Sequence, residues 1–450
     1  MKYIIAIISI LIIIVWMKPW QELNSDTTEE YVMPEDSLSV AIHDLLTNRY
    51  SDLEETKRLD NMIERFLRQW EIKGASLAIM KDGQLIYSKG YGYANVEDSI
   101  PMDVFHIMRV ASVSKLITAA GIMKLVENGK LSLQDKAFGP EGILNDSTVY
   151  GNIKDKRTLD ITVENLLRHQ GGFTTRYGDP MFNPVTVAKK MNAENPATME
   201  TMIQFVLSRR LGFTPGTSTA YSNVGYGILS KIIERVSGQG YEQFIQDSIL
   251  HPAGCFDMHL GHNVYEDRFP NEVRYYEGTD ATPIQACNGA DTLVPRSNGG
   301  NNIEEFYGAG GWVASPTELL LFLAAIDGDD SQPDILSKES VALMTEKVEN
   351  AMPLGWMSTT SGGDWERSGS MAGTSAMLKR QKDGFSWAFT TNTSNWTGPR
   401  FPHKIDNIVA QAMDRVKEWP ERNLFDPEYC KNLLANQEES TVENNAPDNI

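Results

Sequence analysis

Two predicted β-hairpins near opposite ends of the chain constrain the fold more than any other sequence feature. Each joins two strand-like runs across a Lys-Asp-Gly turn, at Lys81-Asp82-Gly83 and at Lys382-Asp383-Gly384. The four runs are residues 75–80, 84–93, 374–381 and 385–392. Asp-Gly tolerates the positive φ of a tight turn, so each pair is predicted to be antiparallel. Because the chain between the hairpins is mainly helical, we expect an α+β fold with a largely antiparallel sheet, built from both chain ends and flanked by helices.

Helix signals occupy much of the remaining chain. Residues 112–330 are predicted to form an inserted, mainly helical lobe, and the loop-rich stretch 264–306 has the length of a binding loop or an insertion. Ser51-Asp52-Leu53-Glu54 is a capping box, which predicts a helix beginning at Ser51. Ser315-Pro316-Thr317-Glu318 has the cap, first-turn proline and glutamate of another helix start. A last helix is predicted to end at Pro420, with an apolar face formed by Ile405, Ile408, Val409, Ala412, Met413 and Val416.

The N-terminus has the pattern of an export signal. Lys2 precedes an uncharged apolar run at residues 3–17, which suits the core of a signal peptide and is short for a membrane span. Residues 1–18 are therefore predicted to be a signal peptide or an uncleaved signal anchor that tethers the protein to a membrane. Either one predicts a periplasmic or cell-envelope location. The other predicted parts are a polar linker, one folded domain and an acidic disordered tail, at residues 19–50, 51–430 and 431–450.

Charge and cysteine usage narrow the partners and cofactors. The formal net charge is −19 and no Lys/Arg run occurs, so a nucleic-acid partner is not expected. Cys255, Cys287 and Cys430 lack metal-ligand spacing. They allow one disulfide at most, and burial as small apolar side chains is the favoured interpretation. His259 and His262 stand three residues apart, but no carboxylate or cysteine pattern supports a metal there, and the sequence predicts neither a metal nor an organic cofactor.

Ser112-Val113-Ser114-Lys115 carries the strongest chemical signal. It lies where a β-like run gives way to a helical pattern, which places the Ser112 hydroxyl and the Lys115 amine on one face of a helix start. A serine hydroxyl is a weak nucleophile until a base takes its proton. A neutral lysine amine within hydrogen-bonding distance can be that base, and both the helix start and a desolvated pocket lower the pKa of the amine.

Two further motifs follow that serine in the chain. Tyr221-Ser222-Asn223 comes after a Pro-Gly-Thr approach, and Arg367-Ser368-Gly369-Ser370 places a cation before small residues. Together the three motifs resemble those of the serine β-lactamase and penicillin-binding-protein superfamily. The tyrosine of the second motif resembles the class C β-lactamase branch, which also contains DD-peptidases, D-amino-acid peptidases and esterases. The resemblance covers about residues 52–420 and implies a β-lactamase/transpeptidase-like fold.

Other segments mimic the second and third motifs, and their context decides against them. Tyr93 begins a Tyr-x-Asn sequence ahead of the serine, and the similar sequence at Tyr150 lacks the Pro-Gly-Thr approach. His169 comes too early to begin the third motif, and Lys382 lies in a hairpin turn. The favoured members are therefore Tyr221 and Arg367.

The resemblance implies a mechanism in which Ser112 attacks a substrate carbonyl and forms an acyl-enzyme. Lys115 and Tyr221 are expected to share the proton transfers, with either of them as the base. Asn223 is expected to hold the substrate's amide or carbonyl. The backbone N–H groups of Ser112 and Ser370, beside the small residue Gly369, are expected to stabilise the oxyanion.

Arg367 departs from the lysine or histidine that the family usually has at this position. Arginine keeps the positive charge, lowers the pKa of neighbouring groups and suits a bidentate contact with a substrate carboxylate. It does not act in a proton relay, because it does not titrate. Efficient β-lactam hydrolysis is therefore in doubt, whereas peptide and ester substrates stay open. No carboxylate for deacylation is identified from the sequence.

The predicted function is that of an exported serine hydrolase acting on an amide, an ester or a β-lactam, including cell-wall peptides. The alternative is a catalytically weak or inactive penicillin-binding or sensor protein of the same fold. The intact Ser112, Lys115 and Tyr221 favour the hydrolase, whereas Arg367 and the long loops favour the sensor. A third interpretation, a membrane-tethered scaffold, requires the serine to be dispensable.

Overall fold

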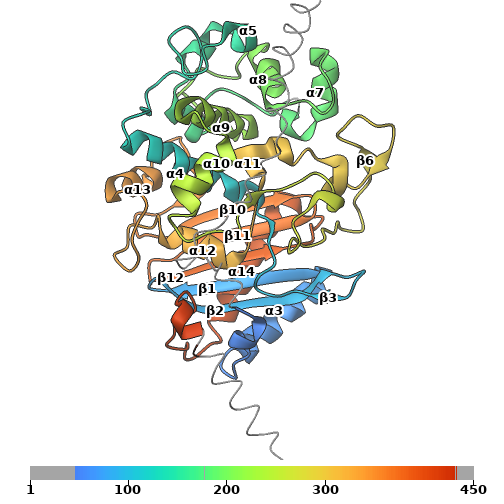
Figure 1. Ribbon diagram of the computed structural model, residues 1–450, viewed down its shortest axis with the longest axis vertical. Helices are drawn as coiled ribbons and strands as arrows, with labels where there is room; N and C mark the ends of the chain where they lie inside the picture. The colour runs from blue at the N-terminus through green and yellow to red at the C-terminus, as the bar shows by residue number, and fades with distance from the viewer. Residues whose placement is uncertain (1–45, 177, 431, 433–450) are drawn as a thin grey trace, which may run out of the picture. The chain divides into compact units, whose positions relative to one another are not determined.

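The computed structural model describes residues 46–176, 178–430 and 432. Within them, the two hairpins lie side by side at the centre of a seven-stranded antiparallel sheet (Figure 1). In spatial order its strands are β3 (Ile100–Pro101), β2 (Gln84–Asn95), β1 (Gly74–Lys81), β12 (Phe385–Thr391), β11 (Thr374–Arg380), β10 (Trp365–Met371) and β9 (Ser358–Thr359). The predicted fold class is thereby confirmed.

Both predicted turns are present, with different backbone geometry. In the first, Asp82 and Gly83 both have positive φ, 47° and 77°, as a two-residue turn between twisted strands requires. In the second, Gly384 alone has positive φ, 88°, and Gly384 N–H donates to Gln381 O. The shared Lys-Asp-Gly sequence thus closes a two-residue loop in one hairpin and a longer loop in the other.

The central strands are buried on both faces. Leu77, Ile79 and Phe389 face one core, which is covered by α3 (Lys57–Gln69) and α14 (Phe401–Met413). The rings of Phe66 and Phe401 stack there at 5.7 Å. The alternate residues of β1 face the larger core beneath α12 (Pro316–Ala324) and the helical lobe. This alternation explains why β1 is an almost unbroken apolar run in the sequence.

The inserted lobe holds most of the helices, as predicted. Its helices are α4 (Ser114–Glu127), α5 (Ser147–Tyr150), α6 (Val163–Leu167), α7 (Pro184–Met191), α8 (Met199–Leu207), α9 (Asn223–Ser237), α10 (Tyr241–Ile245) and α11 (Tyr307–Gly310), and α13 (Lys338–Thr345) follows α12. A small sheet of β4 (Met108–Arg109), β8 (Trp312–Ala314) and β5 (His259–Leu260) joins the lobe to the segment that carries Ser112.

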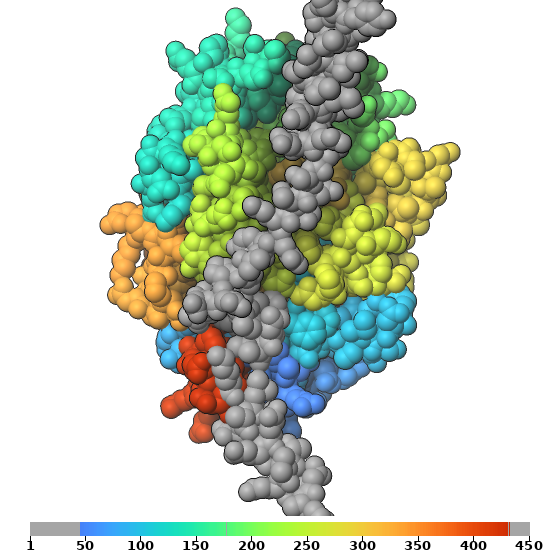
Figure 2. Space-filling model, viewed as in Figure 1, coloured from blue at the N-terminus to red at the C-terminus, as the bar shows by residue number. Residues whose placement is uncertain are grey.

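Residues 264–306 form a long segment between β5 and α11. They contain the hairpin of β6 (Ile284–Gln285) and β7 (Leu293–Val294) and otherwise short turns and loops. Figure 2 shows this yellow segment between the blue strands and the green helices. Isolated bridges pair Glu272 with Ile107, just before β4, and Tyr276 with Thr393, just after β12.

Two predicted helix boundaries are wrong. The first helix begins at Lys57, because Ser51 is fully buried and its hydroxyl accepts the Ser88 N–H at 3.0 Å instead of capping a helix. The last helix ends at Met413, ahead of Pro420. The start at Pro316 is confirmed, and Ser315 accepts the Glu318 N–H as its cap.

The predicted signal or anchor at residues 1–18, including the tether at 3–17, lies outside the described residues. Most of the predicted linker and tail does so as well. Among the helices that the structure does describe, none has the length and apolar character needed to cross a bilayer. Cys255, Cys287 and Cys430 are free and buried, which confirms the favoured interpretation of the cysteines.

Candidate active site

Ser112 lies at the junction between a short strand and a helix. β4 pairs with β8, and Val110 N–H donates to Trp312 O at 3.0 Å. Ala111 then has a φ of 48°, an uncommon conformation for a residue with a Cβ. This turn redirects the chain into a 3₁₀ turn at Ala111–Val113 and then into α4. The Ser112 side chain is half-buried and lines a cleft.

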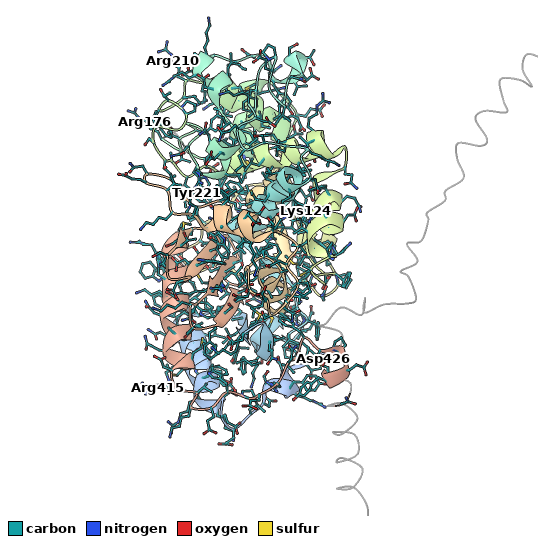
Figure 3. All side chains as sticks on the ribbon, turned by 90° about the vertical axis from the view of Figure 1, so that its left-hand side faces the viewer. Lys124, Arg176, Arg210, Tyr221, Arg415 and Asp426 are labelled. Carbon is teal, nitrogen blue, oxygen red and sulfur yellow. The ribbon has the colours of Figure 1, made fainter. Side chains whose placement is uncertain are left out.

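The structure brings the Ser112 hydroxyl together with side chains from both predicted partner positions. Tyr221 Oη donates to Ser112 Oγ at 2.8 Å, and Lys115 Nζ donates to the same oxygen at 3.3 Å. Tyr221 comes just before α9, and Figure 3 shows it where the helical lobe meets the sheet. The hydroxyl of Ser112, the amine of Lys115 and the phenol of Tyr221 therefore share one site, although Ser112 and Tyr221 are 109 residues apart in sequence.

Lys115 is fully buried and its amine has three acceptors. Besides Ser112 Oγ, Nζ donates to Asn223 Oδ1 at 2.7 Å and to Ala309 O. Burial lowers the pKa of Lys115 to about 8, and the Arg367 guanidinium acts in the same direction. Three acceptors around one nitrogen match the three N–H groups of a protonated lysine.

Arg367 lies beneath Tyr221 and is fully buried. Its Nη2 donates to Tyr221 Oη at 2.8 Å, its Nε donates to Ser112 O at 2.7 Å, and Nη1 has no partner among the described residues. Burial raises the pKa of Tyr221, but the charges of Arg367 and Lys115 outweigh that effect and lower it to about 8. Arg367 does not line the cleft, so the predicted contact with a substrate carboxylate does not fit its position.

Asn223, the first residue of α9, is held by a carboxylate that sequence reasoning missed. Asn223 Nδ2 donates to Asp179 Oδ2 at 2.8 Å, which turns the amide oxygen toward Lys115. Asp179 also accepts the Met181 N–H as the cap of a 3₁₀ turn at Pro180–Phe182. The aspartate before Pro180 was a visible cap signal, but nothing local in the sequence linked it to Asn223.

His169, rejected as a third-motif residue, lies in the site in another role. Its ring stacks on Tyr221 at 4.4 Å between centroids, and Nδ1 accepts the Ser222 N–H at 3.1 Å. Burial, together with the charges of Lys115 and Arg367, holds the pKa of His169 well below its usual value. A neutral imidazole therefore supports one face of Tyr221.

The segment Ser368–Met371 of β10 forms the wall opposite α9. β9 pairs only with Trp365 and Glu366, so the strand edge beyond them has no strand partner among the described residues. A Cβ on Gly369 would lie 2.2 Å from Val110 O and 2.8 Å from Ser112 N. Glycine therefore allows β10 to lie directly against the backbone of the nucleophile segment.

The cleft above Ser112 has a volume of about 520 Å³. Besides predicted site residues, it is lined by apolar side chains that sequence reasoning did not identify. These are Phe182, Phe306, Ala309, Met352, Met357, Met371, Pro399 and Pro402. They come from five separate parts of the chain, which explains why no sequence motif predicted them.

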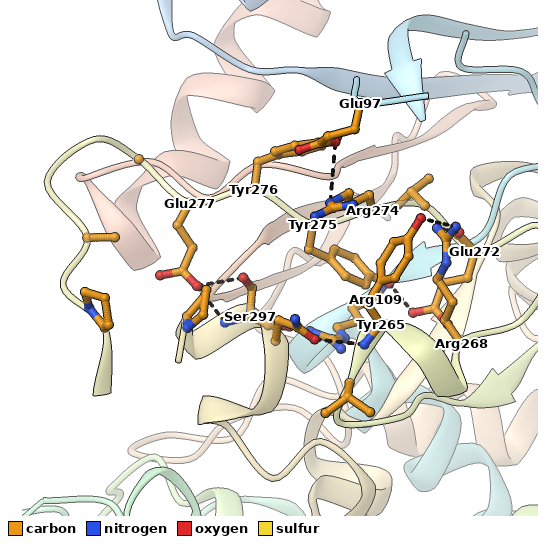
Figure 4. Close-up of a pocket in the computed structure, with 17 residues that line it drawn as sticks. Glu97, Arg109, Tyr265, Arg268, Glu272, Arg274, Tyr275, Tyr276, Glu277 and Ser297 are labelled. Atoms are coloured by element: carbon orange, nitrogen blue, oxygen red, sulfur yellow. Dashed lines mark hydrogen bonds and ion pairs between the residues drawn. The ribbon is translucent and has the colours of Figure 1, made fainter. Parts of the chain in front are cut away.

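A second cavity, of about 310 Å³, is lined by Arg109 of β4 and by residues of the segment 264–298 (Figure 4). Its charged side chains are largely engaged with each other and with neighbouring groups, as Arg274 is with Glu97. Arg109 donates to the carbonyls of Ser297 and His262 and stacks on Tyr275. Within the described residues, no cluster of His, Cys, Asp and Glu side chains is arranged to hold a metal ion.

Comparisons with known proteins agree with this geometry. Residues 59–411 match the family described as Beta-lactamase. Protein flp of Staphylococcus aureus strain MRSA252 is 27% identical over 231 residues, which is 51% of this chain and 42% of the relative. Penicillin-binding protein 4* of Bacillus subtilis strain 168 is 28% identical over 223 residues, 49% of this chain and 44% of the relative. The matches thus span less than half of each relative's own length.

Solved structures share the fold. The D-amino acid amidase of Ochrobactrum anthropi SV3 superposes with a TM-score of 0.62 at 20% identity and covers 81% of this chain and 99% of its own. The octameric penicillin-binding protein homologue of Pyrococcus abyssi has a TM-score of 0.58 at 26% identity, with 81% and 79% covered. The hydrolase EstCE1 has a TM-score of 0.60 at 20% identity, with 79% and 98% covered.

Proposed function

The chain belongs to the beta-lactamase family, and from that premise we propose that it is a serine hydrolase that forms an acyl-enzyme on Ser112. The observation that carries the proposal is the relay of contacts from Arg367 Nη2 to Tyr221 Oη to Ser112 Oγ, with 2.8 Å at each step. A phenolate between a fixed cation and a serine hydroxyl is arranged to take the serine's proton.

Tyr221 is the base in this proposal, and Lys115 is its charged partner. Lys115 Nζ already has three acceptors, so a neutral amine would leave one of them without a proton. Tyr221 Oη instead faces two cationic groups, which stabilise a phenolate. The proton moves from Ser112 Oγ to Tyr221 Oη as Oγ bonds to the substrate carbonyl carbon.

The remaining steps use the same groups. The tetrahedral oxyanion accepts hydrogen bonds from the backbone N–H groups of Ser112 and Ser370, and loss of one such donor typically costs about 3 kcal/mol. The bond from carbon to the leaving oxygen or nitrogen then breaks, and Tyr221 returns its proton to the leaving group. Tyr221 next takes a proton from water, whose oxygen attacks the acyl carbon. The bond between that carbon and Ser112 Oγ then breaks, Tyr221 returns the proton to Oγ, and the acid departs.

The proposal predicts that replacement of Ser112 alone abolishes covalent labelling. Ser112→Ala should show no adduct with a fluorophosphonate probe and should lose at least about 1,000-fold in hydrolysis of p-nitrophenyl butyrate. Ser147→Ala, at an exposed serine of α5, is the matched control and should label fully. Intact mass spectrometry reads the adduct. Full labelling of Ser112→Ala would refute the role of this serine.

A sensor-like protein of the same fold is the second candidate. It is favoured by the absence of carboxylates from the cleft's described lining, because deacylation then depends on Tyr221 alone. A stable acyl adduct without released acid would identify this alternative. As part of the hydrolase proposal, we also propose that the protein belongs to the class C branch and is exported through residues 1–18. Mass spectrometry of the mature N-terminus tests the export segment.

A further inference from the structure

We infer that the substrate of this site is a neutral ester or amide with an apolar acyl group, and that substrates bearing a free carboxylate are poor. This inference rests on the proposed acyl-enzyme function and names the substrate class for it. Three features of the described cleft support it: an apolar lining, catalytic cations that are already engaged, and the location of other charges in a separate cavity.

The side chains that line the cleft provide apolar contact and neutral hydrogen-bonding groups. Phe182 and Phe306 form one wall, with ring centroids 4.9 Å apart. Three methionines, Met352, Met357 and Met371, form much of the rest. Methionine is flexible and polarisable, so this surface adapts to apolar groups of different shape. The other polar lining groups are neutral hydroxyls and the Asn223 amide.

Neither catalytic cation is available to a carboxylate. Lys115 and Arg367 are both 0% exposed, and neither residue lines the cleft. Arg367 donates to Tyr221 Oη and to the Ser112 carbonyl, and its remaining nitrogen, Nη1, is buried rather than open to the cleft. The three acceptors described above surround the Lys115 amine. A carboxylate in the cleft would therefore lose its hydration without gaining an ionic partner, which is unfavourable.

A cluster of arginines elsewhere in the described chain belongs to a different cavity. Arg109, Arg268 and Arg274 line the cavity of Figure 4, which shares no lining residue with the cleft. Arg268 and Arg274 both lie against the ring of Tyr265, at 3.8 and 4.7 Å from its centroid. These cations are thus held away from a substrate acylated at Ser112.

A matched pair of esters tests the inference. p-Nitrophenyl butyrate and p-nitrophenyl hemisuccinate have acyl chains of similar length and differ by a terminal carboxylate. We expect kcat/KM for the hemisuccinate to be at least about 30-fold lower, because a carboxylate is desolvated without a partner. From acetate to butyrate to hexanoate, kcat/KM should rise about threefold per added methylene. Equal rates for the pair, or no gain with chain length, would overturn the inference.

A charged side chain introduced into the lining of the Ser112 cleft tests the substrate inference independently. Met371→Lys places an ammonium in the cleft lining and should raise the hemisuccinate-to-butyrate ratio of kcat/KM at least about tenfold. Met371→Leu is the matched variant of similar volume and should keep the wild-type ratio. An unchanged ratio in Met371→Lys would contradict the assignment of the substrate to this cleft.

The same comparison can be made without turnover, which separates the two proposals. Fluorophosphonates with a propyl chain or a carboxyethyl chain react with Ser112 in a single step. We expect the propyl probe to label at least about 30-fold faster. If neither probe labels Ser112, the proposed function fails. If both label Ser112 at similar rates, the acyl-enzyme chemistry stands and the apolar-substrate inference is wrong.

Discussion

Tyr221 Oη lies 2.8 Å from both Ser112 Oγ and Arg367 Nη2. Its distance to the serine is shorter than the 3.3 Å from Lys115 Nζ, and the charges of Arg367 and Lys115 lower its pKa to about 8 against the effect of burial. The two candidate bases that the motifs leave equivalent are therefore distinguished by their partners. Lys115 Nζ donates to three acceptors, whereas Tyr221 Oη accepts from Arg367 Nη2 and lies near the charges of both Arg367 and Lys115.

This assignment predicts the pH dependence of catalysis. Tyr221 must be deprotonated and Lys115 protonated, and both pKa values are about 8. Activity should therefore rise with pH as Tyr221 ionises, fall as Lys115 loses its proton, and form a narrow maximum near pH 8. Arg367→Met removes a cation that lowers the pKa of Tyr221, so the rising limb should move to higher pH. At pH values below the rising limb, an increase of one unit in the pKa of Tyr221 lowers kcat/KM about tenfold.

Arg367→Lys is the control for that experiment, because it keeps a cation beside Tyr221. Its rising limb should stay near that of the wild type. The measurement is kcat/KM for p-nitrophenyl butyrate between pH 6 and pH 10, after thermal unfolding has established that each variant is folded. An unshifted limb in Arg367→Met would mean that Tyr221 is not the base.

At the scale of elements, α12 shows how a helix start can hold a buried titratable side chain. Glu318 in its first turn is fully buried, and its Oε1 accepts the N–H groups of Phe256 and Asp257 at 2.9 and 2.8 Å. Its Oε2 has no partner among the described residues. Burial raises the pKa of Glu318 to about 8, so the folded state favours the neutral acid.

The raised pKa predicts the sign of a stability change. In the unfolded chain Glu318 ionises near its ordinary value, so the folded state loses stability as pH rises from there to about 8. Glu318→Gln keeps an oxygen acceptor and does not ionise. Between pH 5 and pH 8.5 this variant should gain about 4 kcal/mol in unfolding free energy relative to the wild type. Urea denaturation at both pH values measures the difference.

Glu339→Gln, at an exposed position of α13, provides the matched control and should track the wild type at both pH values. If the Glu318→Gln difference does not change with pH, Glu318 is ionised in the folded protein. Asp257 N–H and Phe256 N–H would then be holding a carboxylate.

Elements whose signals are local could be predicted from the sequence. Asp82 and Gly83 set a turn by their own backbone preferences, and Ser315 caps α12 through a residue three positions away. Ser51 has an equally good local signal, but a contact with Ser88 on a neighbouring strand uses its hydroxyl. Local capping energies of about 1 kcal/mol are readily overridden by such tertiary contacts.

The candidate site likewise contains residues that local sequence motifs predict and residues whose roles depend on tertiary contacts. Ser112 and Lys115 are one helical turn apart, and Tyr221 and Arg367 lie in motifs with recognisable neighbours. The role of Asp179 depends on a contact with Asn223, 44 residues away, which no local pattern encodes. The apolar walls of the cleft likewise depend on which loops the fold brings together, so substrate preference could not be predicted from the motifs.

At the scale of the whole molecule, β1 and β12 join segments about 300 residues apart in sequence. Phe389 in β12 is fully buried, pairs in register with Leu77 of β1, and belongs to the core that α3 and α14 cover. The opposite face of the same strands, including Ala388, belongs to the core of the helical lobe. Sheet and lobe therefore share their central strands, which predicts that they unfold together.

Phe389→Ala tests this shared dependence. Loss of a fully buried phenylalanine should lower the unfolding free energy by about 3–5 kcal/mol, whereas Leu293→Ala, at a side chain that is 75% exposed, should change it by less than about 0.5 kcal/mol. Far-UV circular dichroism follows mainly the helices, and tryptophan fluorescence includes Trp387 of β12. Both signals should shift to the same lower urea midpoint in Phe389→Ala. A helical signal that persists after the fluorescence change would show that the lobe folds independently of the strands that join the two chain ends.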